Sequence, residues 1–378
     1  SLRTKDEGFR SRETFQRMER GNSKSFGLGI VQNRIAGLIT DTEKTNKGEK
    51  MSKKILVVLM FISLVSILLS VQIIGLAQTE EYKPKKTEYN FVFIPKLVHP
   101  WYETVKVGIE EAIEEFAKKG ITINYSWDAT STADVLAQTQ KLESAAAKNP
   151  DGISIAIIDA SVTTAIIDDL VANGIKVSTF DTDAPDSDRL SYCGHADNKG
   201  DGAALAKILA KKIGEEGEIA ILSGTLSAPN HKERVEGFKE EIANYPNIKI
   251  VAEYLDEDSL EKAISLTESI LQGNPNLSGI FGCNATNVYG AARAVVDAGL
   301  KDQITIVGMD DEPETISGIQ DGSIYAAMVQ NVKEIGYRSI FTMVKIADGI
   351  LPESKEDEVG AFLVMKDSLE NYHTVTGK

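Results

Sequence analysis

From Glu88 onward, two patterns of hydrophobic and polar positions alternate along the chain. Short runs rich in β-branched and aromatic residues, such as residues 89–94, are typical of strands. Longer segments, such as residues 100–116, repeat their apolar residues every three or four positions, which is typical of a helix with one buried face. The same patterns predict further strands at 121–126, 153–158, 176–180, 218–222, 248–254, 278–282, 303–308, 323–329 and 360–365, and further helices at 131–148, 161–172, 198–213, 230–244, 258–272, 286–298, 312–320 and 331–348.

This alternation predicts an α/β fold built from right-handed strand–helix–strand units. Continuous apolar strands such as residues 304–307 suit a parallel sheet that is covered by helices on both faces. About ten strands exceed one compact sheet, so we expect two doubly wound, Rossmann-like lobes of parallel strands. The pattern restarts near Gly194 and His195, where the first lobe should end.

Residues 51–77 have the features of an export signal. The basic residues Lys53 and Lys54 precede a largely apolar stretch at 55–69, and small residues at Gly75 and Ala77 favour cleavage after Ala77. The sequence therefore predicts export by the Sec route to the periplasm or another extracytoplasmic location. The apolar stretch is long, and the alternative is an uncleaved anchor that would hold the protein on the membrane.

The segment before this signal is unexpected, because a signal peptide should stand at the N-terminus. Our hypothesis is that Met51 is the true start and that residues 1–50 are an upstream, non-native extension. The alternative is a cytoplasmic extension on a membrane-anchored protein. Residues 78–87, a polar stretch of Lys, Glu and Pro, are expected to form a short tether.

Charge and cysteine content narrow the possible functions. The net charge is −15, and basic residues concentrate in the N-terminal segment, so the folded part is more acidic than the whole chain. We therefore expect no nucleic-acid partner. Two cysteines, Cys193 and Cys283, exclude a disulfide-rich scaffold and are expected to be buried and reduced. Four scattered histidines offer little for a metal cluster, and no cofactor is predicted.

Polar and aromatic side chains follow the predicted strands at the positions where open α/β sheets bind ligands. Carboxylates, amides and a guanidinium can satisfy sugar hydroxyls, and aromatic rings offer flat faces to the C–H side of a sugar. A phosphorylated ligand would need a glycine-rich loop and more basic residues. The candidate residues are Lys96, His99, Trp101, Tyr102, Asp159, Asp181 and Asp183 in the first half, and Asn230, Arg234, Glu257, Asn284, Asp310 and Gln330 in the second half.

Each candidate also has a structural interpretation. Asp181 and Asp310 could be helix caps or turn formers, and the same holds for Asn284, where a cap is favoured. Asp183 lies in a loop where solvated turn residues are common. Arg234 could pair with a neighbouring glutamate on a helix surface, Lys96 could be a solvated strand-end lysine, and Trp101 and Tyr102 could be core aromatics.

Six ordered segments between about Tyr89 and Val364 resemble the ribose/galactose-type (type I) periplasmic sugar-binding proteins of bacterial ABC importers. Their order and spacing carry the resemblance, since each segment alone is a weak signal. They are Pro95–Tyr102, Phe180–Pro185, Glu233–Phe238, Ile280–Asn284, Val307–Asp310 and Ala326–Gln330.

The resemblance implies two lobes that close over one monosaccharide and dock on an ABC permease, with a chemoreceptor as a possible further partner and a monomeric state. Three crossovers would lie near 194, 330–331 and 359–361. They would divide the chain into an N-terminal lobe of residues 88–194 plus 331–359 and a C-terminal lobe of residues 195–330 plus 360–378. The family's stacking positions match Trp101 and Tyr102. Its hydrogen-bonding positions match His99, Asp159, Asp181, Arg234, Asn284, Asp310 and Gln330.

Several residues depart from the family pattern, and these departures affect which sugar the protein is expected to bind. Ribose binders usually have Asn where His99 stands and Asp-Arg where Asp181 and Thr182 stand, and their inter-lobe Phe falls near Glu257. The segments look closer to glucose-type members, so a hexose such as glucose is favoured over a pentose or inositol. Residues 93–98 also resemble the autoinducer-2 and rhamnose branch, which is the alternative, and Lys96 and Asp183 are candidates on that ground.

Two other classes of protein, a transcription regulator and an enzyme, could be built on a similar core. A transcription regulator of the LacI type would need an N-terminal helix-turn-helix, where an apolar signal stands instead. An enzyme would need a recognisable motif, and we find no Gly-x-Ser-x-Gly elbow, HExxH, P-loop or dinucleotide fingerprint. The sequence therefore predicts a binding protein rather than an enzyme.

Overall fold

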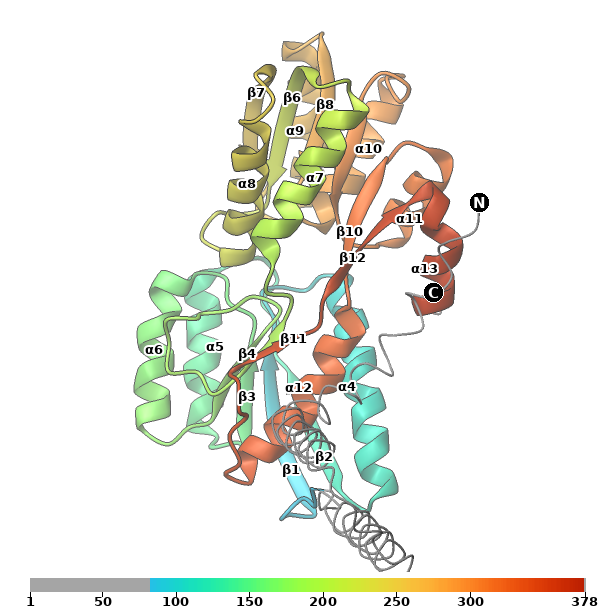
Figure 1. Ribbon diagram of the computed structural model, residues 1–378. Coiled ribbons are helices and arrows are strands. Elements are labelled where there is room, and N and C mark those ends of the chain that lie inside the picture. The colour runs from blue at the N-terminus through green and yellow to red at the C-terminus, as the bar shows by residue number, and fades with distance from the viewer. Residues whose placement is uncertain (1–81, 377–378) are drawn as a thin grey trace, which may run out of the picture. The chain divides into compact units, whose positions relative to one another are not determined.

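The computed structural model describes residues 82–376 (Figure 1). The predicted extension at 1–50, the signal peptide at 51–77 and the first part of the tether lie outside these residues. Within residues 82–376, no helix combines the length and the apolar character that are needed to cross a bilayer.

The described residues form two six-stranded sheets. In spatial order, the first sheet consists of β11 (Glu356–Glu358), β5 (Tyr192–Gly194), β4 (Val177–Phe180), β3 (Gly152–Ile155), β1 (Glu88–Ile94) and β2 (Thr122–Trp127), all parallel. The second consists of β12 (Ala361–Met365), β10 (Ala326–Gln330), β9 (Thr305–Met309), β8 (Leu277–Gly282), β6 (Glu216–Ser223) and β7 (Asn247–Leu255), in which β12 alone is antiparallel to its neighbour. The predicted α/β class with two doubly wound sheets is confirmed.

Helices cover both faces of each sheet, as Figure 1 shows. On the first sheet, α4 (Trp101–Lys118) and α12 (Val332–Ala347) pack on one face, and α5 (Val135–Ala147) and α6 (Ala160–Ala172) pack on the other. On the second, α7 (Asn198–Lys212) and α8 (Pro229–Ile242) face α9 (Leu260–Gly273), α10 (Ala285–Asp297) and α11 (Pro313–Asp321) across the strands. The short α13 (Leu369–Thr376) follows β12.

Burial of both sheet faces explains the continuous apolar strands in the sequence. Along β1, Phe91 and Phe93 point to one face, while Val92 and Ile94 belong to the core cluster beneath α5 and α6, and all four are buried. The polar candidate residues such as Asp181 and Asp310 lie beyond the strand ends, where they can form a site.

Three connections join the two sheets within the described part of the chain: one from β5 to α7, one from β10 to α12, and one from β11 to β12. The first and third lie side by side, since Val359 N donates to Gly194 O at 2.9 Å. Asn331, in the second connection, donates its N–H to Gly360 O at 3.1 Å. These bonds gather the three connections into one hinge region.

Helices α7 and α8 approach each other closely through two glycines. A Cβ at Gly202 would lie 2.0 Å from Arg234 O, and one at Gly237 would lie 2.0 Å from Lys199 O. Neither position can therefore accept a side chain without moving a helix. The close contact fixes α8, which carries the candidate residues Asn230 and Arg234.

Some elements were not predicted from the sequence. They are β5 and β11, which have three residues each, and α13. Cys193 lies in β5 and Cys283 follows β8 in the other sheet, and both are buried and free, as expected.

His195, in the first connection, lies between two carboxylates of the hinge region, one from each lobe. Its Nε2 lies 2.7 Å from Asp201 Oδ2 in α7, and its Nδ1 lies 2.8 Å from Glu358 Oε1 in β11. Burial alone would lower the pKa of His195, but the two carboxylates outweigh it and raise the pKa above its ordinary value. The imidazolium form therefore holds elements of both sheets together.

We expect this histidine to make stability depend on pH. Because its folded-state pKa is raised, its contribution is fully present below the unfolded-state pKa of about 6.5 and is lost as pH rises through the folded-state value. Thermal melting from pH 6 to pH 9 should show wild type losing stability relative to His195→Gln as pH rises. Parallel pH profiles for the two proteins would contradict this role.

Candidate functional site

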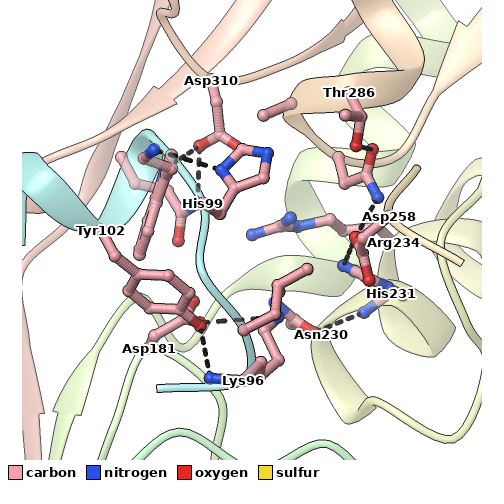
Figure 2. Close-up of a pocket in the computed structure, with 15 residues that line it drawn as sticks. Lys96, His99, Tyr102, Asp181, Asn230, His231, Arg234, Asp258, Thr286 and Asp310 are labelled. Carbon is pink, nitrogen blue, oxygen red and sulfur yellow. Dashed lines mark hydrogen bonds and ion pairs between the residues drawn. The ribbon is translucent and has the colours of Figure 1, made fainter. Parts of the chain in front are cut away.

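A pocket lies at the carboxyl ends of strands from both sheets (Figure 2). It is lined by Lys96, Leu97, His99, Trp101, Tyr102, Asp181, Asn230, His231, Arg234, Asp258, Asn284, Ala285, Thr286, Asp310 and Gln330. These residues come from loops and helix starts that follow β1, β4, β6, β7, β8 and β9, and Gln330 is the last residue of β10. The pocket therefore lies where the sequence predicted it, beyond the carboxyl ends of the strands.

The side formed by the first sheet centres on Asp181, directly after β4. Tyr102 donates its hydroxyl to Asp181 Oδ2 at 2.6 Å, and Lys96 Nζ lies 3.5 Å from the same oxygen. Burial, followed by the Asp181 charge, raises the pKa of Tyr102 well above its ordinary value, so the phenol stays protonated and donates. Lys96 is buried, which excludes the solvated strand-end interpretation.

The side formed by the second sheet includes Asp310, directly after β9. Asp310 Oδ1 accepts from Gln330 Nε2 at 2.8 Å and from Trp101 Nε1 at 3.0 Å. Because Trp101 begins α4 on the first sheet, this bond crosses between the two lobes. Burial raises the pKa of Asp310, while Arg234, Gln330 and Trp101 act in the opposite direction.

A second bond between the lobes joins Ser227 Oγ to Ile158 O at 3.3 Å, so the lobes are closed on each other.

Arg234 is fully buried, at 1% exposure, which excludes the helix-surface interpretation. Its Nε donates to Asn198 Oδ1 at 2.9 Å and its Nη1 donates to Cys283 O at 3.1 Å. Its Nη2 is buried without a hydrogen-bond partner among the described residues. Figure 2 shows the guanidinium pointing into the pocket, where it can donate to a bound molecule.

Three pocket carboxylates stand on left-handed backbone. The φ angles are 58° at Asp181, 59° at Asp258 and 70° at Asp310. Aspartate tolerates this region better than most residues, and such conformations concentrate at functional sites. Neither Asp181 nor Asp310 is a helix N-cap, since α6 follows Asp159 and α11 follows Glu312.

The two pocket histidines are uncharged at neutral pH. Burial lowers the pKa of His99, and it lowers the pKa of His231 to about 4, in both cases against the opposing effect of Asp258. The formal charges of the pocket therefore come from three carboxyl groups and two cations, Lys96 and Arg234. Anionic ligands are disfavoured in such a pocket, while neutral donors and acceptors are well matched.

The structure brings ten of the thirteen sequence-predicted residues to this pocket. Asn284 has two roles there, because it also caps α10 in a reciprocal pair of bonds with Asn287, the structural role that the sequence favoured. The ten are Lys96, His99, Trp101, Tyr102, Asp181, Asn230, Arg234, Asn284, Asp310 and Gln330.

Asp159, Asp183 and Glu257 are not among the residues that line this pocket. Asp159 caps α6 by accepting from Ser161 N. Glu257 is exposed and pairs with Lys262. Their positions after strands made them candidates, but the local backbone turns their carboxylates elsewhere.

Asp183 has a structural partner instead. Arg189, which is 1% exposed, donates from Nε and Nη2 to the two oxygens of Asp183, each at 2.5 Å. Its Nη2 also donates to Glu356 Oε1 in β11 at 2.5 Å. The pair thus attaches the loop after β4 to the strand at the edge of the sheet.

Five lining residues were not predicted: Leu97, His231, Asp258, Ala285 and Thr286. Helical spacing could have identified His231, because it stands three positions before Arg234 and shares its helix face. Asp258 stands beside Glu257 in sequence, and no sequence signal distinguishes the two.

The sequence profile of the periplasmic binding protein domain matches residues 91–350. The chain belongs to this family. The resemblance of its motifs to type I periplasmic binding proteins is therefore confirmed at the family level, and the match spans both sheets of the structure.

Relatives of this periplasmic binding protein domain include two curated proteins. The D-allose-binding periplasmic protein of Escherichia coli (strain K12) is 29% identical over 261 residues, covering 67% of this chain and 82% of the relative. The ribose import binding protein RbsB of Bacillus subtilis (strain 168) is 26% identical over 243 residues, covering 64% of this chain and 76% of the relative.

Solved structures of similar proteins agree with the fold of this periplasmic binding protein. A solute binding protein of an ABC transporter from Burkholderia graminis C4D1M, in complex with D-arabinose, has a TM-score of 0.71 and 30% identity, covering 76% of this chain and 99% of that one. GanP, a glucose-galactose binding protein from Geobacillus stearothermophilus, has a TM-score of 0.69 and 28% identity, covering 75% and 99%.

Proposed function

We propose that this periplasmic binding protein captures one neutral monosaccharide in the pocket between its lobes and delivers it to the permease of an ABC importer. The observation that carries the proposal is the convergence of donors, acceptors and aromatic rings from both sheets on one pocket that the Trp101–Asp310 bond closes. Relatives that bind allose, ribose, arabinose, and glucose or galactose support a sugar as the ligand class.

The chemistry of the pocket suits hydroxyl groups, each of which can donate and accept at once. Carboxylates at Asp181, Asp258 and Asp310 accept, and Lys96 and Arg234 donate. The rings of Trp101 and Tyr102 meet edge to face, with centroids 5.1 Å apart, and offer apolar surface to a sugar ring.

A hexose such as glucose remains our preferred ligand, with a pentose or inositol as alternatives. The autoinducer-2 or rhamnose alternative is less well supported, because it rested partly on Asp183. That carboxylate is occupied by Arg189 and lies outside the pocket lining.

We further propose that the protein acts outside the cytoplasm, as its periplasmic relative does, and that it binds without turnover. The relatives named above are binding proteins, which supports a non-enzymatic role.

A thermal-shift screen of the purified protein tests this proposal. We expect pentoses, hexoses or inositols to raise the melting temperature, since a ligand at 100 times its Kd stabilises the folded state by about 2.7 kcal/mol. Glucose 6-phosphate and glucuronate are expected to have no effect, because three carboxylates line the pocket. A shift with the anionic sugars and none with any neutral polyol would refute the proposal.

A further inference from the structure

Asp258 presents an unused acceptor to the pocket. Its side chain is 10% exposed, and its Oδ2 is buried without a hydrogen-bond partner among the described residues. A buried carboxylate oxygen without a donor is costly, so such an atom in a binding protein indicates a position where a ligand supplies the donor.

The backbone holds this carboxylate in place. The loop after β7 has φ angles of 56° at Glu257 and 59° at Asp258, two successive left-handed residues. Asp256 secures the turn, because its Oδ1 accepts from Asp258 N at 3.0 Å and its Oδ2 accepts from Asn287 Nδ2 at 2.5 Å. This geometry turns Asp258 into the pocket and leaves Glu257 in solvent.

The other oxygen of Asp258 already has donors. Asn284 Nδ2 donates to Asp258 Oδ1 at 2.5 Å, and His231 Nε2 lies 3.8 Å from the same atom. His231 Nδ1 lies 3.1 Å from Thr225 N and 3.2 Å from Thr225 O, so the backbone of Thr225 holds the ring with its Nε2 toward Asp258. Oδ1 is thus fixed by the protein and Oδ2 is left for the ligand.

The charge of Asp258 distinguishes it from Asp181. Asp181 has the Lys96 ammonium at 3.5 Å, whereas the basic side chain that lies within 4 Å of Asp258 in the described part of the chain is His231, which is neutral. An ionised acceptor without a cation binds hydroxyl donors strongly and disfavours a group that can only accept.

We propose that Asp258 is a specificity-determining residue, which accepts a hydrogen bond from one sugar hydroxyl through Oδ2. The inference rests on the proposed function and deepens it. Together with Arg234, whose free Nη2 can only donate, Asp258 requires a ligand that both donates and accepts at this end of the pocket. A hydroxyl meets both requirements, and an ether or a deoxy position does not.

Calorimetric titration with D-allose, D-ribose, D-arabinose, D-glucose and D-galactose tests the assignment in wild type, Asp258→Asn and the matched control Glu257→Gln. We expect Asp258→Asn to raise Kd about tenfold to a hundredfold for each sugar that wild type binds, the range for losing a charged hydrogen-bond partner. Glu257→Gln should stay within twofold of wild type, because Glu257 is exposed and outside the lining.

A second variant separates binding from folding. Asp258→Gly removes the carboxylate and suits the left-handed backbone, so it should also weaken binding even if Asp258→Asn melts at a lower temperature. Wild-type affinity in a folded Asp258 variant, or an equal loss in Glu257→Gln, overturns the assignment. If wild type binds none of the five sugars, the titrations are run with the neutral sugar or inositol that the thermal-shift screen identifies, and failure of every neutral pentose, hexose and inositol overturns the proposed function together with it.

Discussion

Replacing Asp310 with asparagine is expected to weaken sugar binding about a hundredfold, or about 2.7 kcal/mol, with little loss of stability. Asparagine tolerates the φ of 70° at this position, so the loop should keep its shape. The change removes the charge that Trp101 and Gln330 contact and replaces one acceptor oxygen with a donor. Calorimetric titration beside thermal melting measures both effects.

Asp311→Asn is the matched control, because Asp311 is the next residue and its carboxylate accepts from Tyr372 rather than lining the pocket. We expect it to change stability without changing affinity. An Asp310→Asn protein that melts at a lower temperature and binds sugar as wild type does would show that Asp310 belongs to the scaffold.

Arg189→Met should produce the opposite result, a large loss of stability with little change in sugar affinity. Removing the guanidinium leaves Asp183, whose side chain is 14% exposed, without its bidentate partner. Breaking such a buried pair costs about 3–5 kcal/mol. Urea denaturation should show the lost free energy of unfolding, and titration at a temperature where the variant is folded should give a nearly unchanged Kd.

An exposed ion pair provides the control for this loss. Arg293 and Asp297 lie 3.9 Å apart with side chains 66% and 67% exposed, so Arg293→Met should change stability by less than about 1 kcal/mol. If Arg189→Met unfolds at the wild-type urea concentration, or if it abolishes binding while folded, the assignment of Asp183 to the scaffold is wrong.

The contrast between Asp310 and Asp183 shows what the sequence could predict. Buried strands such as Gly152–Ile155 are largely apolar, because both sheet faces are covered, and the sequence therefore indicated their positions. Strand β11 is Glu-Asp-Glu, which no hydrophobic pattern identifies. It forms at the sheet edge beside Arg189 and Arg338, each of which pairs with one of its carboxylates.

The candidate site was predictable where a residue directly follows a strand, as Asp181 and Asp310 do. It was not predictable where two acidic residues share a loop. Asp183 is engaged by an arginine six positions later, and Asp258 lines the pocket whereas its neighbour Glu257, also on left-handed backbone, is exposed. Which acidic residue of a loop faces the pocket depends on packing and on left-handed turns. The position of a residue after a strand carries no information about either.

The most direct test of the proposed function is calorimetric titration of the purified protein with the neutral sugars that stabilise it. We expect one monosaccharide per chain with micromolar or tighter affinity, because the pocket between the closed lobes offers matched donors and acceptors. Absence of binding heat with every neutral pentose, hexose and inositol at millimolar concentration would contradict it.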